Sequence, residues 1–493
     1  MRHVLKVRRR CWASVLALLI TGSALVTAGG ATAATGAPHG ALTALTGAGS
    51  CVGGPGCAPL RGFTEDPAAA TNQIPGVSYG LLQLTAVDGG RTMYVTHGIY
   101  VPWAIAVLSR NPSTGGLSQL AGKRGCITTH PTQGCAFAPP GPHANDLVLS
   151  PDGKRVAVES FKSGKQGYLL LSRNPATGAL RRLGGWRSCV ALIDGACGQI
   201  RGLRVKNQMS LLTEPPYSSY PLGSSTRIIA GHEAGAPGGQ GIAVQHRNAH
   251  GQWHEIPGAS GCTNLRGTPG CHKLACMQGP VSEAVAGRGG HVDVIGGENN
   301  TGYVATFRRT GSGGVQPLGC TTFAARDATG RPIWIQPLPH SSTVLLAAHY
   351  FDHETGFSRE QIYASAPGSN GALTRPRAIS GPLAFAAGDV PALSPDGTTL
   401  YGADYAFGNG GLYIYPVTPT AVTALPAPWF NPFSTPQASN GAHDNGVNNT
   451  PVVSPDGRFV YTITGLFPVE TVTGVQNPSS TNQPEVRAYA VQP

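Results

Sequence analysis

One short phrase recurs seven times along the chain: a β-prone run, a polar turn and a second β-prone run. The two clearest copies are residues 104–120, AIAVLSRNPSTGGLSQL, and residues 167–183, GYLLLSRNPATGALRRL. Looser copies occupy residues 241–256, 302–318, 361–375, 411–425 and 485–491. Units of this length cannot bury their own apolar faces, so they must stack against one another. The repeat therefore constrains the architecture before any functional residue is considered.

A second hairpin lies between consecutive phrases and is built around Ser-Pro-Asp-Gly. It is clearest at residues 150–153, 394–397 and 454–457. Proline fixes φ and glycine tolerates positive φ, which suits a chain that reverses direction. Each unit then holds four antiparallel strands, the content of a propeller blade. Units that begin near residues 78, 145, 205, 281, 333, 389 and 449 predict an all-β, seven-bladed β-propeller.

The two chain ends predict how the ring closes. The last unit ends at Val491 after its third strand. Residues 40–45 (GALTAL) match the fourth-strand segment 178–183 (GALRRL) but have no preceding unit of their own. A sheet built from both ends would remove an open edge, which an unclosed stack would expose. We therefore expect residues 40–45 to complete the last blade.

The first 34 residues have the pattern of a secretory signal peptide. A basic start is followed by an apolar run, residues 13–26, and by Ala31-Thr32-Ala33, a small-residue cleavage site. The apolar run is short for a membrane span, so a cleaved signal is favoured over an anchor. The remaining residues, 35–493, are expected to form a single propeller domain, secreted or held in the cell envelope. We expect a monomer with no membrane span after cleavage.

Composition narrows the class of partner. Loss of residues 1–34 removes five Lys and Arg residues and no acids, so the formal charge falls from +11 to +6. No basic run with interleaved aromatics is present, which argues against a nucleic-acid partner. Charged residues make up 12% of the chain, and the 69 glycines and 41 prolines suit many short strands joined by turns.

Ten cysteines remain after Cys11 is removed, and an even number in an exported chain indicates disulfides. Proximity predicts Cys51–Cys57, Cys126–Cys135, Cys189–Cys197 and Cys262–Cys271, and elimination leaves Cys276–Cys320. A zinc site would need two close pairs converging on one point. These pairs lie on separate repeats, so disulfides are favoured.

The polar residues that enter the first strand of each unit are the candidates for a site. Such strands line the channel of a propeller, so these residues would surround a funnel that suits a small polar ligand. The alternative is that they only face the water of the channel. The expected ring-mouth residues are His143, Asn145, Asp146, Arg204, Lys206, Glu283, Asp389, His443, Asp444, Asn448 and Asn449. No cofactor is expected. Calcium would suit the oxygens of Asp389, Asn145 and Asn449, but no Asp-rich loop of calcium-binding form is present.

Residues 150–158 (SPDGKRVAV) and 169–180 (LLLSRNPATGAL) carry a resemblance. They resemble the lactonase-type, YVTN-like seven-bladed propellers, which include 6-phosphogluconolactonases and exported bacterial relatives. The resemblance covers residues 40–493. It implies two histidines before a Ser-Pro-Asp-Gly strand; His143 keeps the first, and Asn145 stands in the place of the second.

Two functions follow as expectations. The first is an exported binding or scaffold propeller that captures a small polar ligand or a surface protein. The second is a lactonase-like hydrolase, in which His143, Asn145 and Asp146 would be catalytic. Arg204 and Lys206 would then stabilise the developing oxyanion. The fold alone does not choose between these two functions.

Overall fold

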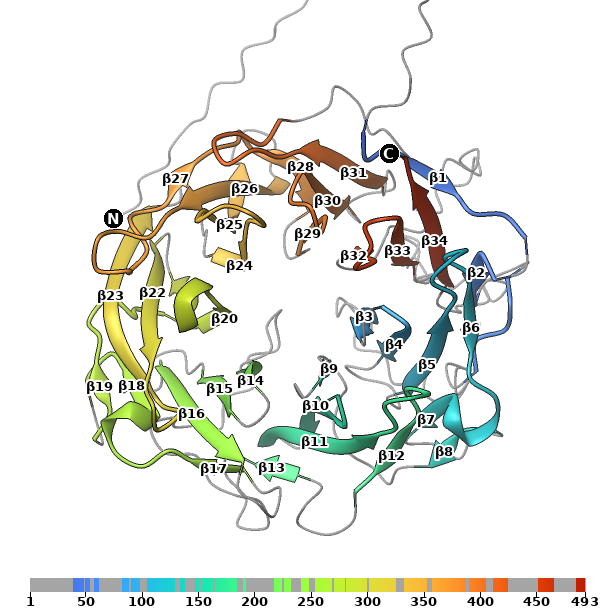
Figure 1. Ribbon diagram of the computed structural model, residues 1–493, viewed down its shortest axis with the longest axis horizontal. Coiled ribbons are helices and arrows are strands. Elements are labelled where there is room, and N and C mark those ends of the chain that lie inside the picture. The colour runs from blue at the N-terminus through green and yellow to red at the C-terminus, as the bar shows by residue number, and fades with distance from the viewer. Residues whose placement is uncertain are drawn as a thin grey trace, which may run out of the picture. The chain divides into compact units, whose positions relative to one another are not determined.

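Seven small sheets follow one another around a ring (Figure 1). The computed structural model describes residues 39–47, 49–53, 57–61, 82–87, 90–97, 104–128, 134–137, 147–149, 153–162, 165–183, 189–191, 217–223, 226–231, 241–247, 253–267, 270–279, 281–298, 301–324, 332–352, 357–386, 390–404, 411–423, 451–464 and 485–492. These residues belong to the unit His39–Pro493 and contain strands and short 3-10 turns, with no α-helix among them. The predicted all-β, seven-bladed propeller is confirmed.

Blades 1 to 3 come from the first half of the chain. Blade 1 contains β3 (Leu82–Val87), β4 (Thr92–His97), β5 (Ala104–Arg110), β6 (Leu117–Gln119), β7 (Cys126–Thr128) and β8 (Ala136–Phe137). Blade 2 contains β9 (Leu147–Leu149), β10 (Arg155–Lys162), β11 (Lys165–Arg173), β12 (Leu180–Arg182) and β13 (Cys189–Ala191). Blade 3 contains β14 (Tyr217–Gly223), β15 (Thr226–Gly231), β16 (Gly241–Arg247), β17 (Trp253–Glu255), β18 (Cys262–Asn264) and β19 (His272–Lys273).

Blades 4 to 7 complete the ring. Blade 4 contains β20 (Val281–Ala286), β21 (His291–Glu298), β22 (Thr301–Arg309) and β23 (Val315–Ala324). Blade 5 contains β24 (Pro332–Pro337), β25 (Val344–Asp352), β26 (Phe357–Ser365), β27 (Arg377–Ala378) and β28 (Leu383–Ala386). The described part of blade 6 contains β29 (Ala392–Leu393), β30 (Thr399–Asp404) and β31 (Gly411–Pro416). Blade 7 contains β32 (Val452–Val453), β33 (Phe459–Thr464) and β34 (Glu485–Val491), together with β1 (Leu42–Ala44) and β2 (Cys51–Val52).

The two repeated turns form the hairpins that their residues predict. In the Ser-Pro-Asp-Gly turn of blade 7, the Ser454 hydroxyl donates to Asp456 and accepts the Phe459 amide at 3.0 Å. Gly457 takes a φ of +70°, which explains the glycine of that turn. In the Asn-Pro-Ser-Thr-Gly turn of blade 1, the Asn111 side chain accepts the Ser113 amide at 2.9 Å. Local side-chain bonds thus stabilise both reversals.

The chain ends close the ring as predicted. β1 pairs antiparallel with β34, with Leu42 opposite Val491 and Ala44 opposite Tyr489. β2 pairs further along the same strand, with Cys51 opposite Arg487. We call residues 39–61 the strap, because they also continue to blade 1. There the Gly49 carbonyl accepts the Leu117 amide at 2.7 Å.

The outer strand of several blades is split in two, which the repeat phrase alone does not reveal. In blade 1, β6 pairs with the end of β5 and β7 pairs with its beginning. Blades 2, 3 and 7 repeat this arrangement, and in all four the second half-strand begins with a cysteine. The residue opposite that cysteine is Ala106, Leu169, Ala243 or Arg487, always the third residue of the repeat phrase.

Four of the five predicted disulfides are present: Cys51–Cys57, Cys126–Cys135, Cys262–Cys271 and Cys276–Cys320. The fifth prediction, Cys189–Cys197, lies outside the described residues because Cys197 does. The Cys126–Cys135 and Cys262–Cys271 bridges hold β8 and β19 parallel to β7 and β18, as an extra outermost layer. Cys276–Cys320 instead joins the segment leading into blade 4 to the outer strand of that blade.

The apolar core lies between blades rather than inside any one of them. Met93 and Val95 of blade 1 pack with Tyr461 and Ile463 of blade 7 in one buried cluster. Other buried clusters join blades 1 and 2, 3 and 4, 4 and 5, 5 and 6, and 6 and 7. Strands sandwiched in this way are apolar on both faces, which explains the almost continuous burial of β5.

Candidate functional site

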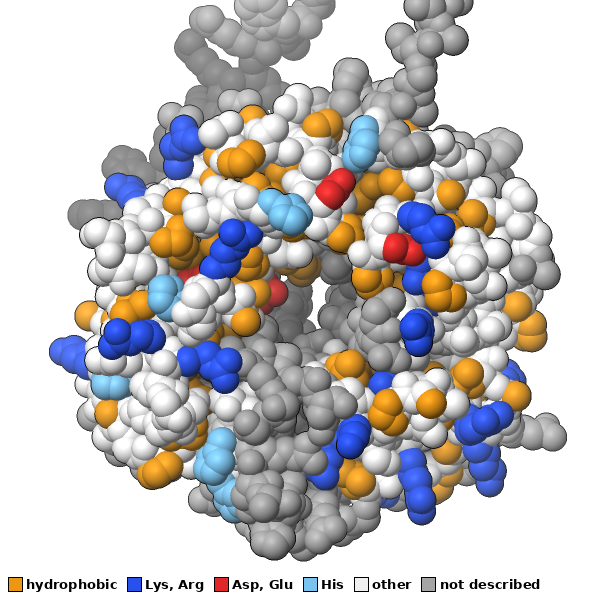
Figure 2. Space-filling model, viewed as in Figure 1, with side chains coloured by type: hydrophobic (Ala, Val, Ile, Leu, Met, Phe, Trp, Pro, Cys, Tyr) orange, Lys and Arg blue, Asp and Glu red, His pale blue; other side chains and the backbone are white. Residues whose placement is uncertain are grey.

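The first strand of each blade lies innermost in the ring (Figure 1). In the space-filling view, an opening lies near the centre of the face shown, and the described Lys and Arg side chains are spread around it (Figure 2). Most of the predicted ring-mouth residues lie outside the described residues. These are His143, Asn145, Asp146, Arg204, Lys206, Asp389, His443, Asp444, Asn448 and Asn449. Their convergence on one site remains a prediction.

Glu283 is the predicted ring-mouth residue that the structure describes. It is half-buried on the innermost strand of blade 4, next to a β-bulge. Its Oε2 accepts the backbone N–H of Ile335, on the innermost strand of blade 5, at 2.7 Å. A carboxylate that accepts a backbone N–H makes a charge-assisted bond, which is stronger than a neutral one. Glu283 therefore joins two neighbouring inner strands.

Farther from the axis, a buried arginine of one blade bonds to a buried tyrosine of the preceding blade. We call this pair a clamp. Arg110, the last residue of β5, reaches blade 7. Its Nε donates to the Tyr461 hydroxyl at 2.7 Å, and its Nη2 lies 3.2 Å from the Asp456 carboxylate. The Tyr461 hydroxyl donates to the Gly115 carbonyl of blade 1 at 2.9 Å. Arg110 and Tyr461 are buried, so the bond between them is shielded from water and would be costly to leave unmade.

Ionisation at this clamp follows from its contacts. Burial raises the pKa of Tyr461 to about 12, so the phenol keeps the proton that it donates to Gly115. Burial alone would raise the pKa of Asp456. Hydrogen bonds from Ser454 and Arg458 and the charge of Arg110 outweigh burial and hold this pKa at about 2. The Asp456 carboxylate is therefore charged at neutral pH and complements the guanidinium.

The same clamp recurs between blades 1 and 2. Arg173 Nε donates to the Tyr94 hydroxyl at 2.8 Å, and Nη1 donates to the Gly153 carbonyl at 2.9 Å. The Tyr94 hydroxyl donates to the Gly178 carbonyl at 2.7 Å. Gly178 has a φ of +76°, and a Cβ there would lie 2.3 Å from the Thr92 side chain. Glycine is thus required both by its φ and by its closeness to the preceding blade.

The junction between blades 4 and 5 departs from this pattern. Asp293 is the third residue of β21. Tyr94 and Tyr461 are likewise the third residues of β4 and β33, so Asp293 occupies the position of these tyrosines. It is 3% exposed, and its Oδ1 accepts the Thr306 hydroxyl at 2.8 Å. Thr306 in turn accepts the Leu373 amide of blade 5 at 3.0 Å. Burial, first of all, raises the pKa of Asp293 to about 6, against the opposing Thr306 bond and the charge of His291.

A small pocket opens beside Asp293. His291, Arg288 and Asp293 line it from blade 4, and Ser341, Ser342 and Thr343 line it from blade 5. Sequence reasoning missed this feature, because Asp293 stands alone in an apolar strand. Aligning the second strand of every unit would have found it, since a buried carboxylate replaces the tyrosine there.

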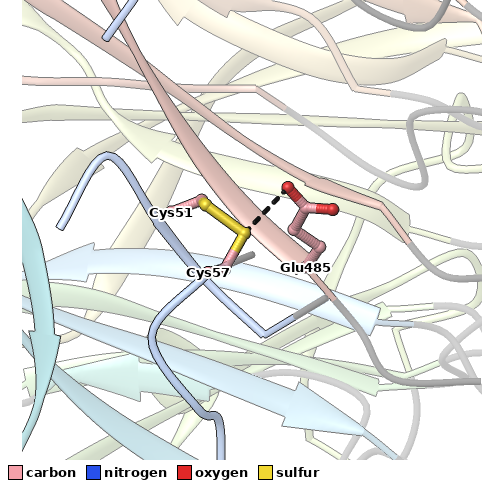
Figure 3. Close-up of side chains that lie close together, drawn as sticks. All are labelled: Cys51, Cys57 and Glu485. Atoms are coloured by element: carbon pink, nitrogen blue, oxygen red, sulfur yellow. Dashed lines mark hydrogen bonds between the residues drawn. A yellow bond between two sulfur atoms is a disulfide. The ribbon is translucent and has the colours of Figure 1, made fainter. Parts of the chain in front are cut away.

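One group of metal-ligand types occurs at the strap. Cys51, Cys57 and Glu485 bring their sulfur and oxygen atoms within 4.8 Å of one another (Figure 3). The two cysteines form a disulfide, and Cys57 Sγ lies 3.3 Å from Glu485 Oε1. A bridged sulfur is no thiolate, and thiolates are what bind metals. The disulfide lies within the strap, and its sulfurs offer no thiolate to a metal, so the group does not form a metal site.

Among the residues that the structure describes, no helix has the length and apolar character needed to cross a membrane.

Comparison with known proteins gives a likeness of fold. No protein-family model matches the chain, and no curated protein matches it. One similar solved structure is described as a "putative 6-phosphogluconolactonase" from Bacteroides fragilis, with 14% identity and a TM-score of 0.46 over 70% of this chain and 82% of that one. A second, from Bacteroides uniformis and described in the same words, has 14% identity and a TM-score of 0.43 over 82% of this chain and 96% of that one. A third is hydrazine synthase from Kuenenia stuttgartiensis, with 10% identity and a TM-score of 0.45 over 79% and 96%.

Likenesses this distant say nothing of activity, substrate or binding site. The blade architecture itself rests on the chain's own seven sheets. This protein is a seven-bladed β-propeller.

Proposed function

We propose that this protein is an exported binding or scaffold propeller of the cell surface or extracellular space. The observation that carries the proposal is the placement of the disulfides. Three of them lie at the outer edge of a blade, each starting from the cysteine opposite the third residue of the repeat phrase. Disulfides persist in oxidising compartments and stiffen the framework that carries exposed loops.

Export and oxidation are tested together by the mass of the secreted protein. Expressed with its own N-terminus, it should reach the medium or envelope without residues 1–34. Full reduction should add about 10 Da, two hydrogens for each of five disulfides including Cys189–Cys197. Retention in the cytoplasm with free thiols would contradict the proposal.

A lactonase-like hydrolase is the second candidate, because residues 141–146 (GPHAND) keep the first histidine of the motif that the chain resembles. The deciding experiment measures the opening of δ-gluconolactone and γ-butyrolactone by the purified protein, its His143→Ala variant and a His272→Ala control. His272 lies on the outermost layer of blade 3, away from the inner strands. A binding protein should give background rates with all three proteins.

Turnover that is lost in His143→Ala and kept in His272→Ala would establish the hydrolase instead. Turnover kept in both variants would remove His143 from the site, although the protein would still be an enzyme.

A further inference from the structure

Each complete clamp consists of an arginine and a tyrosine of the preceding blade. Between blades 4 and 5, other residues stand at both positions. In blades 1, 2 and 5, a serine of the third strand pairs with the first residue of the second strand. The pairs are Ser109 with Thr92, Ser172 with Arg155, and Ser365 with Val344. The residues that follow these serines, Arg110, Arg173 and Ala366, are therefore equivalent. Blade 5 has a methyl group where blades 1 and 2 carry a guanidinium.

The partner of the missing guanidinium is also changed. In the two complete clamps, that group meets a tyrosine hydroxyl of the preceding blade and lies near a turn carbonyl of its own blade, at Gly90 or Gly153. Between blades 4 and 5, the tyrosine position is Asp293, and the register places Ser342 in the position of Gly90 and Gly153. Asp293 and Ser342 both line the pocket.

The carboxylate faces this space with one oxygen uncommitted. Asp293 Oδ1 is bonded to Thr306, whereas Oδ2 has no hydrogen-bond donor among the described residues. Asp293 is 3% exposed, and a cationic N–H group that reached Oδ2 would make a charge-assisted hydrogen bond largely shielded from water.

We propose that the pocket between blades 4 and 5 binds the guanidinium group of a ligand, which takes the place that Arg110 fills between blades 7 and 1 and Arg173 fills between blades 1 and 2. The pocket encloses about 20 Å³, room for one water-sized group. One NH₂ edge of a guanidinium has this size. The rest of the ligand would remain at the mouth, beside Ser341 and Ser342.

Two neighbouring groups oppose a cation and set the expected affinity. Arg288 is exposed, and its Nη2 makes a long contact of 3.4 Å with the Leu338 carbonyl. The ring of His291 lies against Gly371, where a Cβ would be 2.6 Å from Cε1. Either group repels a bound cation when it is charged. Binding should therefore be weak, in the millimolar range, and should tighten when Arg288 is neutralised.

Binding should also depend on pH. The groups that face Asp293 are His291 and Arg288 of blade 4, the hydroxyl of Thr306, and Ser341 to Thr343 of blade 5. Because burial raises the pKa of Asp293 to about 6, the carboxylate is mostly ionised at pH 7.5 and mostly protonated at pH 5. Affinity should fall as the pH is lowered.

The first test titrates the purified protein with methylguanidinium at pH 7.5 and constant ionic strength, with the thermal midpoint as the readout. Tetramethylammonium, which has the charge but no N–H donor, serves as the ligand control. We expect a saturable rise with methylguanidinium alone, weakened at least about tenfold in Asp293→Asn and strengthened in Arg288→Gln. Asp396→Asn, an acid of the blade 6 turn, should behave as the wild type.

The second test delivers the guanidinium from within the chain. Ala366→Arg places an arginine where Arg110 and Arg173 stand, so it should raise the thermal midpoint at pH 7.5 and abolish the response to methylguanidinium. The gain should vanish when Asp293→Asn is added, because the two side chains would then no longer interact.

Equal responses of the wild type and Asp293→Asn to methylguanidinium would overturn the proposal. So would a response that is the same with tetramethylammonium, or a weaker response in Arg288→Gln, which would indicate that the pocket recognises an anion. If Ala366→Arg fails to fold, the ligand titration of the other three variants still decides.

Discussion

Tyr94, Tyr401 and Tyr461 occupy one register position in three blades, and each donates its hydroxyl to a glycine carbonyl of the next blade. For Tyr401 that carbonyl belongs to Gly40, at the start of the strap. The strap thus supplies blade 7 with the same acceptor that a repeat turn supplies to blades 1 and 2. The same polar contact therefore recurs at three junctions between blades.

Tyr461→Phe should weaken the junction between blades 7 and 1. The change keeps the ring but leaves the buried Arg110 Nε without its acceptor and the Gly115 carbonyl without its donor. A loss of about 1–3 kcal/mol is expected in urea unfolding. Tyr363→Phe is the control, because the Tyr363 hydroxyl donates to Gln361 of its own strand. Equal losses in the two variants would show that the contact between blades adds nothing.

Asp293 should make the free energy of unfolding decrease as the pH rises. Its pKa is about 6 in the folded protein and 3.8 as the ordinary value, so the folded state binds the proton more tightly. The stabilisation by that proton is complete below about pH 4 and is lost as the pH rises through 6. The difference amounts to roughly 3 kcal/mol at most.

Asp293→Asn removes this dependence, and the comparison is made by urea unfolding between pH 4 and 8. The stability of the variant relative to that of the wild type should increase as the pH rises. This difference should become constant above about pH 7. A constant difference across the range would mean that Asp293 does not titrate in this window.

At the scale of elements, the hairpins were predictable and the outer edges were not. Proline, glycine and asparagine fix the turns locally, so residues 111–115 and 454–457 reveal their conformation in the sequence. The second half-strands β7 and β18 have three residues each, too few for an alternation of apolar and polar residues to show. The spacing of the cysteines predicts the disulfide pairing. The position of these half-strands at the blade edge depends on contacts between residues distant in sequence.

The candidate site was less predictable than the fold for a physical reason. The ring-mouth residues belong to segments that enter the inner strands, and where such segments converge depends on long connections without repeated turn residues. The register of a strand is different, because it is fixed by burial on both faces. Asp293 is recognised as a departure from the clamp once the second strands of the units are aligned in this register.

The disulfides should differ in their contribution to stability. Cys276–Cys320 closes a loop of 44 residues and Cys126–Cys135 a loop of nine. Chain entropy then gives about 4 kcal/mol for the first and about 2.6 kcal/mol for the second. Replacing each pair by serines and measuring urea unfolding tests the order. A larger loss of stability on removal of Cys126–Cys135 would show that loop length does not set the order of the two contributions.

At the scale of the molecule, the strap joins the first described strand to the last. It covers the free edge of β34, carries the Cys51–Cys57 bridge and continues to blade 1, where the Arg61 amide donates to Gln119 at 2.8 Å. The edge of β34 is thus paired at the seam, and the short strand β1 becomes the outer edge of blade 7.

Deleting residues 35–61 should therefore open the seam. We expect a lower thermal midpoint and association through the exposed edge of β34, seen as a shift to larger species in size-exclusion chromatography. A chain that begins at His39 is the control and should remain monomeric. An unchanged elution volume and midpoint in the longer deletion would mean that blades 1 and 7 hold together without the strap.

Closure also sets the order in which the ring can be completed during synthesis. Thr43 and Gln492, which bond across the seam, are 449 residues apart. At 5 to 20 residues per second, roughly 20 to 90 s separate the making of the two strands. Throughout that interval β1 has no β34 to pair with, whatever the other blades have achieved. The first described strand to be translated must wait, unpaired, for the last.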